Sequence, residues 1–191
     1  MKSFYDNFSS LEKEIMNCKK CGLCNSRNHI VIGEGSLNAK LMLIGEAPGY
    51  DEDLQGKPFV GKAGKLLDKV LDKVGIKRED IYICNILKCR PPGNRNPSPE
   101  EMDLCIDYLR NQVLLIKPKI IVLMGSIALK KIMGKEHGIT RERGKWINMK
   151  GIYYLPTWHP AAVLRDANKL NQFYNDFRLV KFTLDKMDKS L

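Results

Sequence analysis

Short apolar runs alternate with amphipathic segments along this chain. Four runs are rich in aliphatic residues, at positions 41–44, 81–87, 120–124 and 152–156. Runs of this kind predict strands that are buried on both faces. Between them, apolar residues recur every three or four positions, which predicts helices. We expect helices at residues 3–16, 61–74, 98–116 and 126–133, and a last one from residue 170 onwards.

Residues at the helix ends support these boundaries. Gly75 follows the second helix and predicts a C-terminal cap, because glycine tolerates the left-handed backbone that ends many helices. Ser98, Pro99 and Glu101 match a capping box with proline at the first helical position. The first helix is expected to be amphipathic, with an apolar face made of Phe4, Phe8, Leu11 and Ile15.

Strands that alternate with helices predict an α/β fold, here a three-layer α/β/α arrangement with a central four-stranded parallel sheet. We expect one domain over residues 1–191, because no repeat or linker divides the chain. The carboxyl ends of parallel strands share one edge of the sheet, where ligands bind. Each predicted strand ends at or near chemically distinctive residues: Glu46, Asn85, Gly125-Ser126 and His159.

Two loops rich in glycine and proline lie near this predicted crevice. Residues 45–49 follow the first strand, and their glycines would let backbone N–H groups approach a flat ligand. Residues 56–63 carry Phe59 and approach the phosphate-binding P-loop pattern. Ala63, however, stands where that pattern needs a hydroxyl for magnesium, and the glycines do not directly follow a strand. A nucleoside triphosphate site is therefore rejected.

The charge balance indicates a polyanionic partner. The chain has 32 Lys and Arg residues against 22 Asp and Glu, a formal net charge of +10. Nucleic acid is the simplest such partner, and a basic solvated surface is the alternative. The mixed charges of the N-terminus do not match a signal peptide, and no apolar run approaches the roughly 20 residues that span a bilayer. We expect a cytoplasmic protein without a membrane partner.

Cysteine spacing indicates a metal centre. Six cysteines in an intracellular chain favour metal or redox chemistry over disulfides. Cys18 and Cys21 form a chelating pair, and Cys89 and Cys105 supply two more sulfurs. Four thiolates suit zinc or an iron–sulfur cluster, and the wide second spacing favours [4Fe–4S]. Cys24 keeps the ligand count open, since it could chelate with Cys21.

Several short motifs then occur in a familiar order over residues 18–180. They are Gly45-Glu-Ala-Pro-Gly49, Gly56-Lys-Pro-Phe-Val-Gly61, Asn85-Ile-Leu-Lys-Cys-Arg-Pro-Pro92, Asn94-Arg-Asn-Pro97 and His159-Pro-Ala-Ala-Val-Leu-Arg165. With the cysteine spacing, the chain resembles the family 4 uracil-DNA glycosylases, the iron–sulfur branch of their superfamily. The resemblance implies a monomeric DNA-repair enzyme that flips uracil out of single- or double-stranded DNA and hydrolyses its N-glycosidic bond, leaving an abasic site.

The resemblance also implies a ligand set for the cluster. It assigns a structural [4Fe–4S] cluster to Cys18, Cys21, Cys89 and Cys105. Cys24 and Cys84 would then be bystanders, and Cys84 lies in an apolar run where a small buried hydrophobe is expected.

Roles for the crevice residues follow from the chemistry of uracil. Phe59 would stack on the flipped base, and Asn85 would pair with uracil O4 and N3–H. His159 would contact O2 and stabilise the departing base. Glu46, Ala47 and Pro48 would line the other side.

Two features of these motifs concern the activation of the attacking water and the exclusion of thymine. Ala47 stands where better-known relatives carry Asp or Asn to position the attacking water. Water activation then falls to Glu46, or matters little if departure of the base is the hard step. Either Glu52 or Asp53 is expected to narrow the pocket near the position of thymine's methyl group.

The segment after His159 is expected to contact DNA. Val163 and Leu164 would wedge into the gap left by the flipped base, and Arg165 would hold a phosphate. An ordinary helix start is the alternative for this segment. Further phosphate contacts are expected from Lys62, Lys65, Arg90 and Arg95.

Two other hypotheses account for part of the pattern. In one, the cluster is the active part of a redox protein that releases no base. In the other, zinc holds together a non-catalytic nucleic-acid-binding module.

Overall fold

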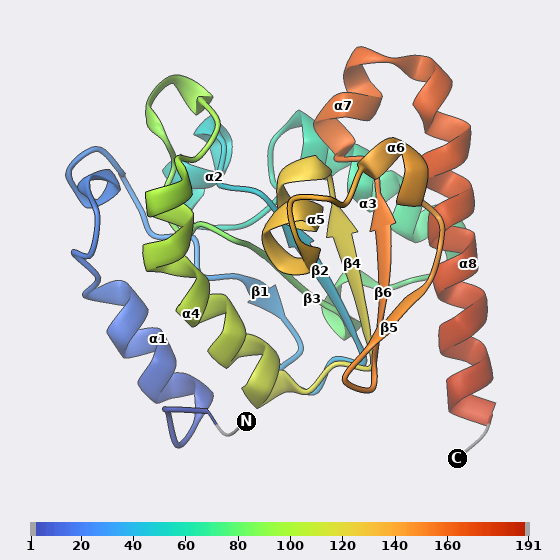
Figure 1. The fold of residues 1–191 in the computed structure, drawn as a ribbon, viewed down its shortest axis with the longest axis horizontal. Coiled ribbons are helices and arrows are strands. Elements are labelled where there is room, and N and C mark those ends of the chain that lie inside the picture. Colours follow the sequence, from blue (N-terminus) through green and yellow to red (C-terminus); the bar gives the residue numbers. More distant parts are fainter. Residues whose placement is uncertain (1–2, 190–191) are drawn as a thin grey trace.

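The computed structural model describes residues 3–189, which contain one six-stranded sheet. The four strands predicted from the sequence form its parallel centre. In spatial order they are β3 (Tyr82–Asn85), β2 (Leu41–Gly45), β4 (Ile120–Met124) and β6 (Ile152–Thr157) (Figure 1). Every residue of β2, β3 and β4 is buried. The central four-stranded parallel sheet is therefore confirmed.

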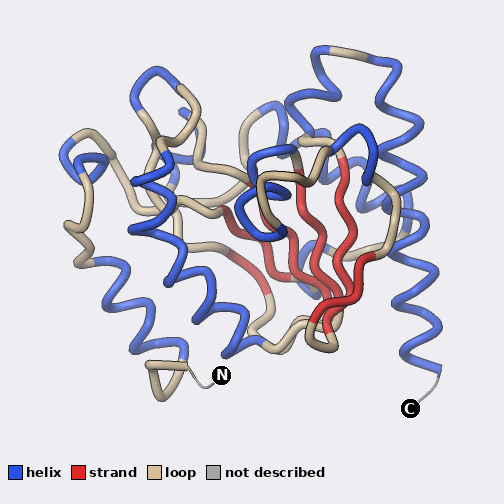
Figure 2. Tube along the Cα trace, in the orientation of Figure 1, coloured by secondary structure: helices blue, strands red, loops and turns tan. Residues whose placement is uncertain are grey.

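Two short antiparallel strands extend the sheet at its edges (Figure 2). β1 (Glu34–Gly35) pairs with β3, and β5 (Ile147–Met149) pairs with β6. These strands have two and three residues and are partly exposed. The sequence did not predict them, because segments this short carry no apolar run.

Helices cover both faces of the sheet and complete three layers (Figure 1). Side chains of β2 alternate between the faces: Leu43 packs with Leu67 and Phe173 on one side, and Met42 packs with Ile106 and Leu129 on the other. The first face is covered by α3 (Lys62–Val74), α7 (Pro160–Arg165) and α8 (Leu170–Lys189). The second is covered by α4 (Pro99–Ile116) and α5 (Ser126–Met133). Two short helices, α2 (Tyr50–Gln55) and α6 (Ile139–Glu142), lie within connecting segments.

The N-terminal helix is shorter than predicted. α1 (Phe8–Met16) begins at Phe8 because the Asn7 side chain accepts a hydrogen bond from the Ser10 N–H at 3.0 Å and caps the helix there. Phe4 lies ahead of this cap and is 91% exposed, so the prediction that it joins the apolar face was wrong. Leu11 is buried as predicted, and α1 packs against α4.

The two predicted helix caps are confirmed. The Ser98 hydroxyl accepts from the Glu101 N–H at 3.1 Å, and the Glu101 carboxylate accepts from the Ser98 N–H at 2.8 Å. Gly75 ends α3 with a φ of 75°, in the left-handed region. Among residues 3–189, no helix combines the length and the apolar character needed to cross a bilayer.

Candidate functional site

The carboxyl ends of the four parallel strands open into one cleft of about 660 Å³. Phe59, Asn85 and His159 all line this cleft, although they lie far apart in the sequence. The loop after β2 lines it as well, through Glu46 and the two residues that follow, Ala47 and Pro48. The convergence predicted from the strand ends is therefore confirmed.

Asn85 presents an unsatisfied acceptor in this cleft. It is the last residue of β3 and is 2% exposed, and its Oδ1 has no hydrogen-bond partner among the described residues. Leaving a buried acceptor unpaired costs on the order of 1–3 kcal/mol, so such groups are rare in folded proteins. A ligand with an N–H donor would satisfy this atom.

The neighbouring strand leaves room for the Asn85 amide. Gly45 lies opposite Asn85 in the register of β2 and β3. A Cβ atom on Gly45 would lie 2.4 Å from Asn85 Oδ1 and 2.6 Å from the Phe59 ring. Only glycine fits between the two groups that are candidates for base contact.

His159 is held as a neutral hydrogen-bond donor. It caps α7, and its Nδ1 accepts a hydrogen bond from the Ala161 N–H at 3.2 Å. The ring proton therefore sits on Nε2, which is free to donate. Desolvation, with a smaller effect of the Arg165 charge, lowers the pKa of His159 to about 4.

The end of β6, two residues before His159, is anchored to α8. The buried Thr157 hydroxyl donates to the Asp176 carboxylate at 2.6 Å, and the Arg143 guanidinium pairs with the same carboxylate. This buried group lies two residues before His159 and fixes the end of β6.

Phe59 belongs both to the core and to the cleft. Its ring is 5% exposed and packs in the core, yet it also lines the cleft. Its φ of 51° lies in the left-handed region, which is uncommon for a bulky residue. Gly64 permits this conformation, because a Cβ there would lie 1.8 Å from the Phe59 carbonyl oxygen.

Glu52 ties the Phe59 loop to the loop after β2. Its Oε1 accepts from the N–H groups of Val60 and Gly61, both at 2.9 Å, and its Oε2 accepts from the Gly49 N–H at 3.1 Å. Glu52 lines the cleft, but its carboxylate is used for this bracing. Asp53 instead accepts from the backbone and side chain of Asn28, at 2.9 and 2.5 Å, and does not line the cleft. Of the two residues that were alternatives for the position near a thymine methyl group, Glu52 lines the cleft and Asp53 does not.

Glu46, from the loop after β2, is a second acidic residue that lines the cleft. Burial raises the pKa of its carboxyl group above the ordinary value. Its carbonyl oxygen accepts from the Leu87 N–H at 3.1 Å, which fixes the backbone as it leaves β2.

The predicted DNA contacts differ in whether they line the cleft, are exposed outside it, or are buried in the core. Arg165 and Arg95 line the cleft, and the Arg95 guanidinium is paired with Glu101 at 2.6 Å. Leu164 is 52% exposed, whereas Val163 is 4% exposed and packs in the core. Val163 is therefore unavailable as a wedge, which corrects its assignment. The lysines of the first turns of α3, Lys62 and Lys65, are exposed outside the cleft.

Other lining residues were not predicted. They include Ile127, Ile139 and Trp158. Ile127 and Ile139 lie in the first turns of α5 and α6, Trp158 directly follows β6, and none of them carries a spacing signal that would place it in a cleft.

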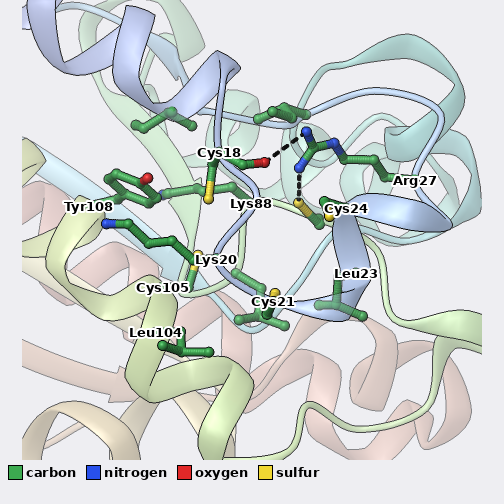
Figure 3. Close-up of a pocket in the computed structure, with 14 residues that line it drawn as sticks. Cys18, Lys20, Cys21, Leu23, Cys24, Arg27, Lys88, Leu104, Cys105 and Tyr108 are labelled. Carbon is green, nitrogen blue, oxygen red and sulfur yellow. Dashed lines mark hydrogen bonds between the residues drawn. The ribbon is translucent and has the colours of Figure 1, made fainter.

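Five cysteines line a second, small cavity between α1, α4 and the segment after β3 (Figure 3). They are Cys18, Cys21, Cys24, Cys89 and Cys105. Cys84 lies apart from them, on β3 and fully buried in the core, as predicted for a small hydrophobe.

Two donors face this sulfur-lined cavity. Arg27 donates from Nη1 to Cys89 Sγ at 3.2 Å and from Nη2 to the Cys18 carbonyl at 3.0 Å (Figure 3). The Tyr108 hydroxyl is buried and has no partner among the described residues. Burial raises the pKa of Cys105 to about 11 and also raises that of Cys89, which Arg27 opposes.

The residues around this cavity are of the kinds that hold a sulfur-ligated metal centre. Within residues 3–189, no three His, Cys, Asp or Glu side chains gather as ligands of one metal ion. A [4Fe–4S] cluster spreads its four thiolate ligands over separate irons, so its sulfurs stand further apart. Sulfurs from three chain segments, a cationic donor and an unpaired hydroxyl around one cavity suit such a group.

Comparison with known proteins shows the family to which the chain belongs. The profile of the "Uracil DNA glycosylase superfamily" matches residues 32–178. A type-4 uracil-DNA glycosylase of Archaeoglobus fulgidus is 41% identical over 183 residues, 92% of each chain. Those of Saccharolobus solfataricus and Thermotoga maritima are 43% and 42% identical, over 94% and 85% of this chain and 87% and 86% of theirs. The chain belongs to the type-4 uracil-DNA glycosylases.

Proposed function

We propose that this enzyme excises uracil from DNA by flipping the base into the cleft and hydrolysing its N-glycosidic bond. Its relatives are named uracil-DNA glycosylases, hydrolases of N-glycosyl bonds. The observation that carries the proposal is the unpaired Asn85 Oδ1 beside the Phe59 ring and the His159 donor. Uracil offers an N3–H donor between its two carbonyl acceptors. That edge complements the amide acceptor and amide donor of Asn85 and the imidazole donor of His159.

Asn85 would select uracil over cytosine. Its Oδ1 accepts from uracil N3–H while its Nδ2 donates to O4. Cytosine presents an acceptor at N3 and a donor at N4, so both contacts would be mismatched. A mispaired buried edge costs on the order of 1–3 kcal/mol for each group.

His159 would stabilise the base as it leaves. When the N1–C1′ bond breaks, its electron pair stays on the base, and the negative charge is shared with O2. The Nε2–H of a neutral imidazole donates to O2 and binds this charge most strongly in the transition state. The sugar becomes an oxocarbenium ion, and water adds to C1′ and loses a proton.

Glu46 would take that proton. Ala47 has no side chain that could hold the water, and Glu46 is the carboxylate of this loop that faces the cleft. Its raised pKa makes it a better proton acceptor than an exposed glutamate. We expect its contribution to be smaller than that of His159, because departure of the base is the more demanding step.

The exposed end of α7 would fill the gap left by the flipped base. Leu164 is the exposed apolar side chain there, and the following Arg165 would bind a phosphate beside it. The net charge of +10 would favour DNA in general, with Lys62, Lys65, Arg90 and Arg95 as further phosphate contacts.

The cysteine cavity would hold a [4Fe–4S] cluster on Cys18, Cys21, Cys89 and Cys105. When bound, such a cluster supplies a covalent cross-link between segments far apart in the sequence. Here it would brace the N-terminal segment against α4 and the loop that carries Arg95. Residues 1–191 would then act as one monomeric catalytic domain, working inside the cell on the chromosome.

A uracil-containing oligonucleotide tests this function directly. The wild-type protein should convert the uracil to an abasic site that alkali cleaves, and should leave cytosine intact. Asn85→Asp should lose most uracil excision and gain cytosine excision, because a carboxyl group can match the cytosine edge. Failure of the wild-type protein to release uracil would refute the proposal, and full discrimination by Asn85→Asp would refute its account of base selection.

A further inference from the structure

Lys88 is a fully buried lysine between the two candidate sites. It is 2% exposed and lies between Asn85 and Cys89 in the sequence. Burying an ammonium group is costly unless its hydrogen bonds are satisfied. No carboxylate among the described residues forms an ion pair with it. Its cost must therefore be offset by other contacts.

Those contacts lead to the base site. Lys88 Nζ donates to the Asn85 carbonyl oxygen at 2.8 Å and to Gln112 Oε1 at 2.7 Å. The Gln112 amide in turn donates to the Ile32 carbonyl at 3.0 Å and to the Tyr82 hydroxyl at 3.1 Å. The ammonium is thus held at a fixed point, and it fixes the peptide group of Asn85 where β3 ends.

Lys88 also borders the cysteine cavity. It lines that cavity together with Cys89 and Cys105, and Figure 3 draws it among the residues around the cavity. A cluster with four thiolate ligands carries net negative charge, which a buried cation nearby would offset. Lys88 therefore touches the backbone of the base-selecting residue and borders the cluster ligands at once.

We propose that Lys88 is a positioning residue that couples the two sites: its ammonium group balances the charge of the cluster and holds Asn85 in the orientation that reads uracil. This rests on the proposed function of the cleft. An aliphatic residue would suit the burial, but it could neither hold the Asn85 carbonyl nor balance the charge. The cluster would thereby support base selection as well as the fold.

Two variants separate this role from a merely structural one. Lys88→Met keeps the length and removes the donors and the charge. Tyr82→Phe removes the far end of the same buried network but leaves the contact between Lys88 and Asn85. Both should lower the melting temperature. Only Lys88→Met should weaken binding of free uracil, by about tenfold or more, because the Asn85 peptide group loses the contact that holds it in position.

Two further measurements test the coupling between the cluster and base selection. In Lys88→Met, the ratio of uracil to cytosine excision should fall, and the visible absorption of the cluster should decay several-fold faster in air. A folded Lys88→Met with wild-type uracil binding, discrimination and cluster lifetime would overturn the proposal. A Tyr82→Phe variant that matched Lys88→Met in all three would also overturn it.

One measurement needs no variant, in case Lys88→Met does not fold. In wild-type protein labelled with ¹⁵N at lysine, the Lys88 Nζ resonance should shift when free uracil is added. A resonance that stays in place at saturating uracil would overturn the coupling. Wild-type protein that releases no uracil from DNA would instead refute the proposed function, so the two failures are distinguishable.

Discussion

The Phe59 ring lies 5.7 Å from the His159 imidazole, centre to centre, at an interplanar angle of 35°. A base sandwiched between two rings needs about 7 Å, twice the roughly 3.5 Å contact distance between carbon atoms. Uracil therefore cannot lie between these two rings in the structure as it stands. It would lay its face on Phe59 and present the edge that carries O2 to His159. In this arrangement the Phe59 ring would pack against the base, and the His159 ring would stabilise the negative charge that develops on O2.

Gly64→Ala should disable the site without unfolding the protein. A methyl group at Gly64 would lie 1.8 Å from the Phe59 carbonyl, so the loop that carries the ring must move. We expect kcat/KM for uracil excision to fall about tenfold or more, because small displacements of positioning groups are costly. Gly138→Ala is the matched control, since a Cβ there meets nothing within 4 Å. Equal activity of the two variants would contradict this role of Gly64.

Glu52→Gln should loosen both loops that shape the cleft. The carboxylate accepts three backbone N–H bonds with two oxygens, whereas an amide keeps one acceptor oxygen. We expect the free energy of unfolding to fall by about 1–3 kcal/mol and uracil affinity to fall with it. Glu100→Gln, an exposed position on α4, is the control. A Glu52→Gln variant as stable as that control would show that the bracing is unimportant.

The protonation of His159 predicts a specific pH response. Its pKa in the folded protein is about 4, below the ordinary value of 6.5. The folded state therefore binds fewer protons than the unfolded state between these values, and stability should decrease as pH falls through this window. Base release should stay insensitive to His159 protonation down to about pH 5. Measurement of ¹⁵N shifts should find the proton on Nε2, and titration near 6.5 or a proton on Nδ1 would contradict the mechanism.

Arg165→Ala should affect DNA but not the free base. Loss of one phosphate contact should lower affinity for DNA and reduce the slope of log K against log salt by about one. Affinity for free uracil should stay unchanged, because the base is held by other residues. Arg110→Ala, on the exposed side of α4, removes the same charge outside the cleft. A salt slope that changes equally in both variants would exclude a specific phosphate contact at Arg165.

The centre of the site could be predicted from the sequence because the ends of regular parallel strands lie at one edge of the sheet. Asn85 ends β3 and His159 lies two residues after β6, and parallel strands bring such positions to one edge. The edge strands were missed because two or three residues carry no periodic signal. For the segment that starts at Pro160, the sequence allows two interpretations, a wedge that enters DNA or an ordinary helix start. The structure forms a helix there and places its Val163 in the core.

Positions that depend on tertiary packing could not be predicted. Ile139 lines the cleft although it lies at the start of α6, far from any strand end in the sequence. Phe4 is exposed because Asn7 caps α1 later than apolar periodicity suggests. Lys88 reads as an ordinary surface lysine in the sequence. Its burial appears only when Gln112, from a helix 24 positions away, supplies an acceptor.

The central claim is that Phe59, Asn85 and His159 together hold one extruded uracil. A crystal structure of the protein soaked with free uracil tests it most directly. We predict that the base stacks on the Phe59 ring, with N3–H on Asn85 Oδ1 and O2 within hydrogen-bond distance of His159 Nε2. Uracil bound in the cleft with its N3 edge turned away from Asn85, or bound elsewhere on the protein, would contradict the account.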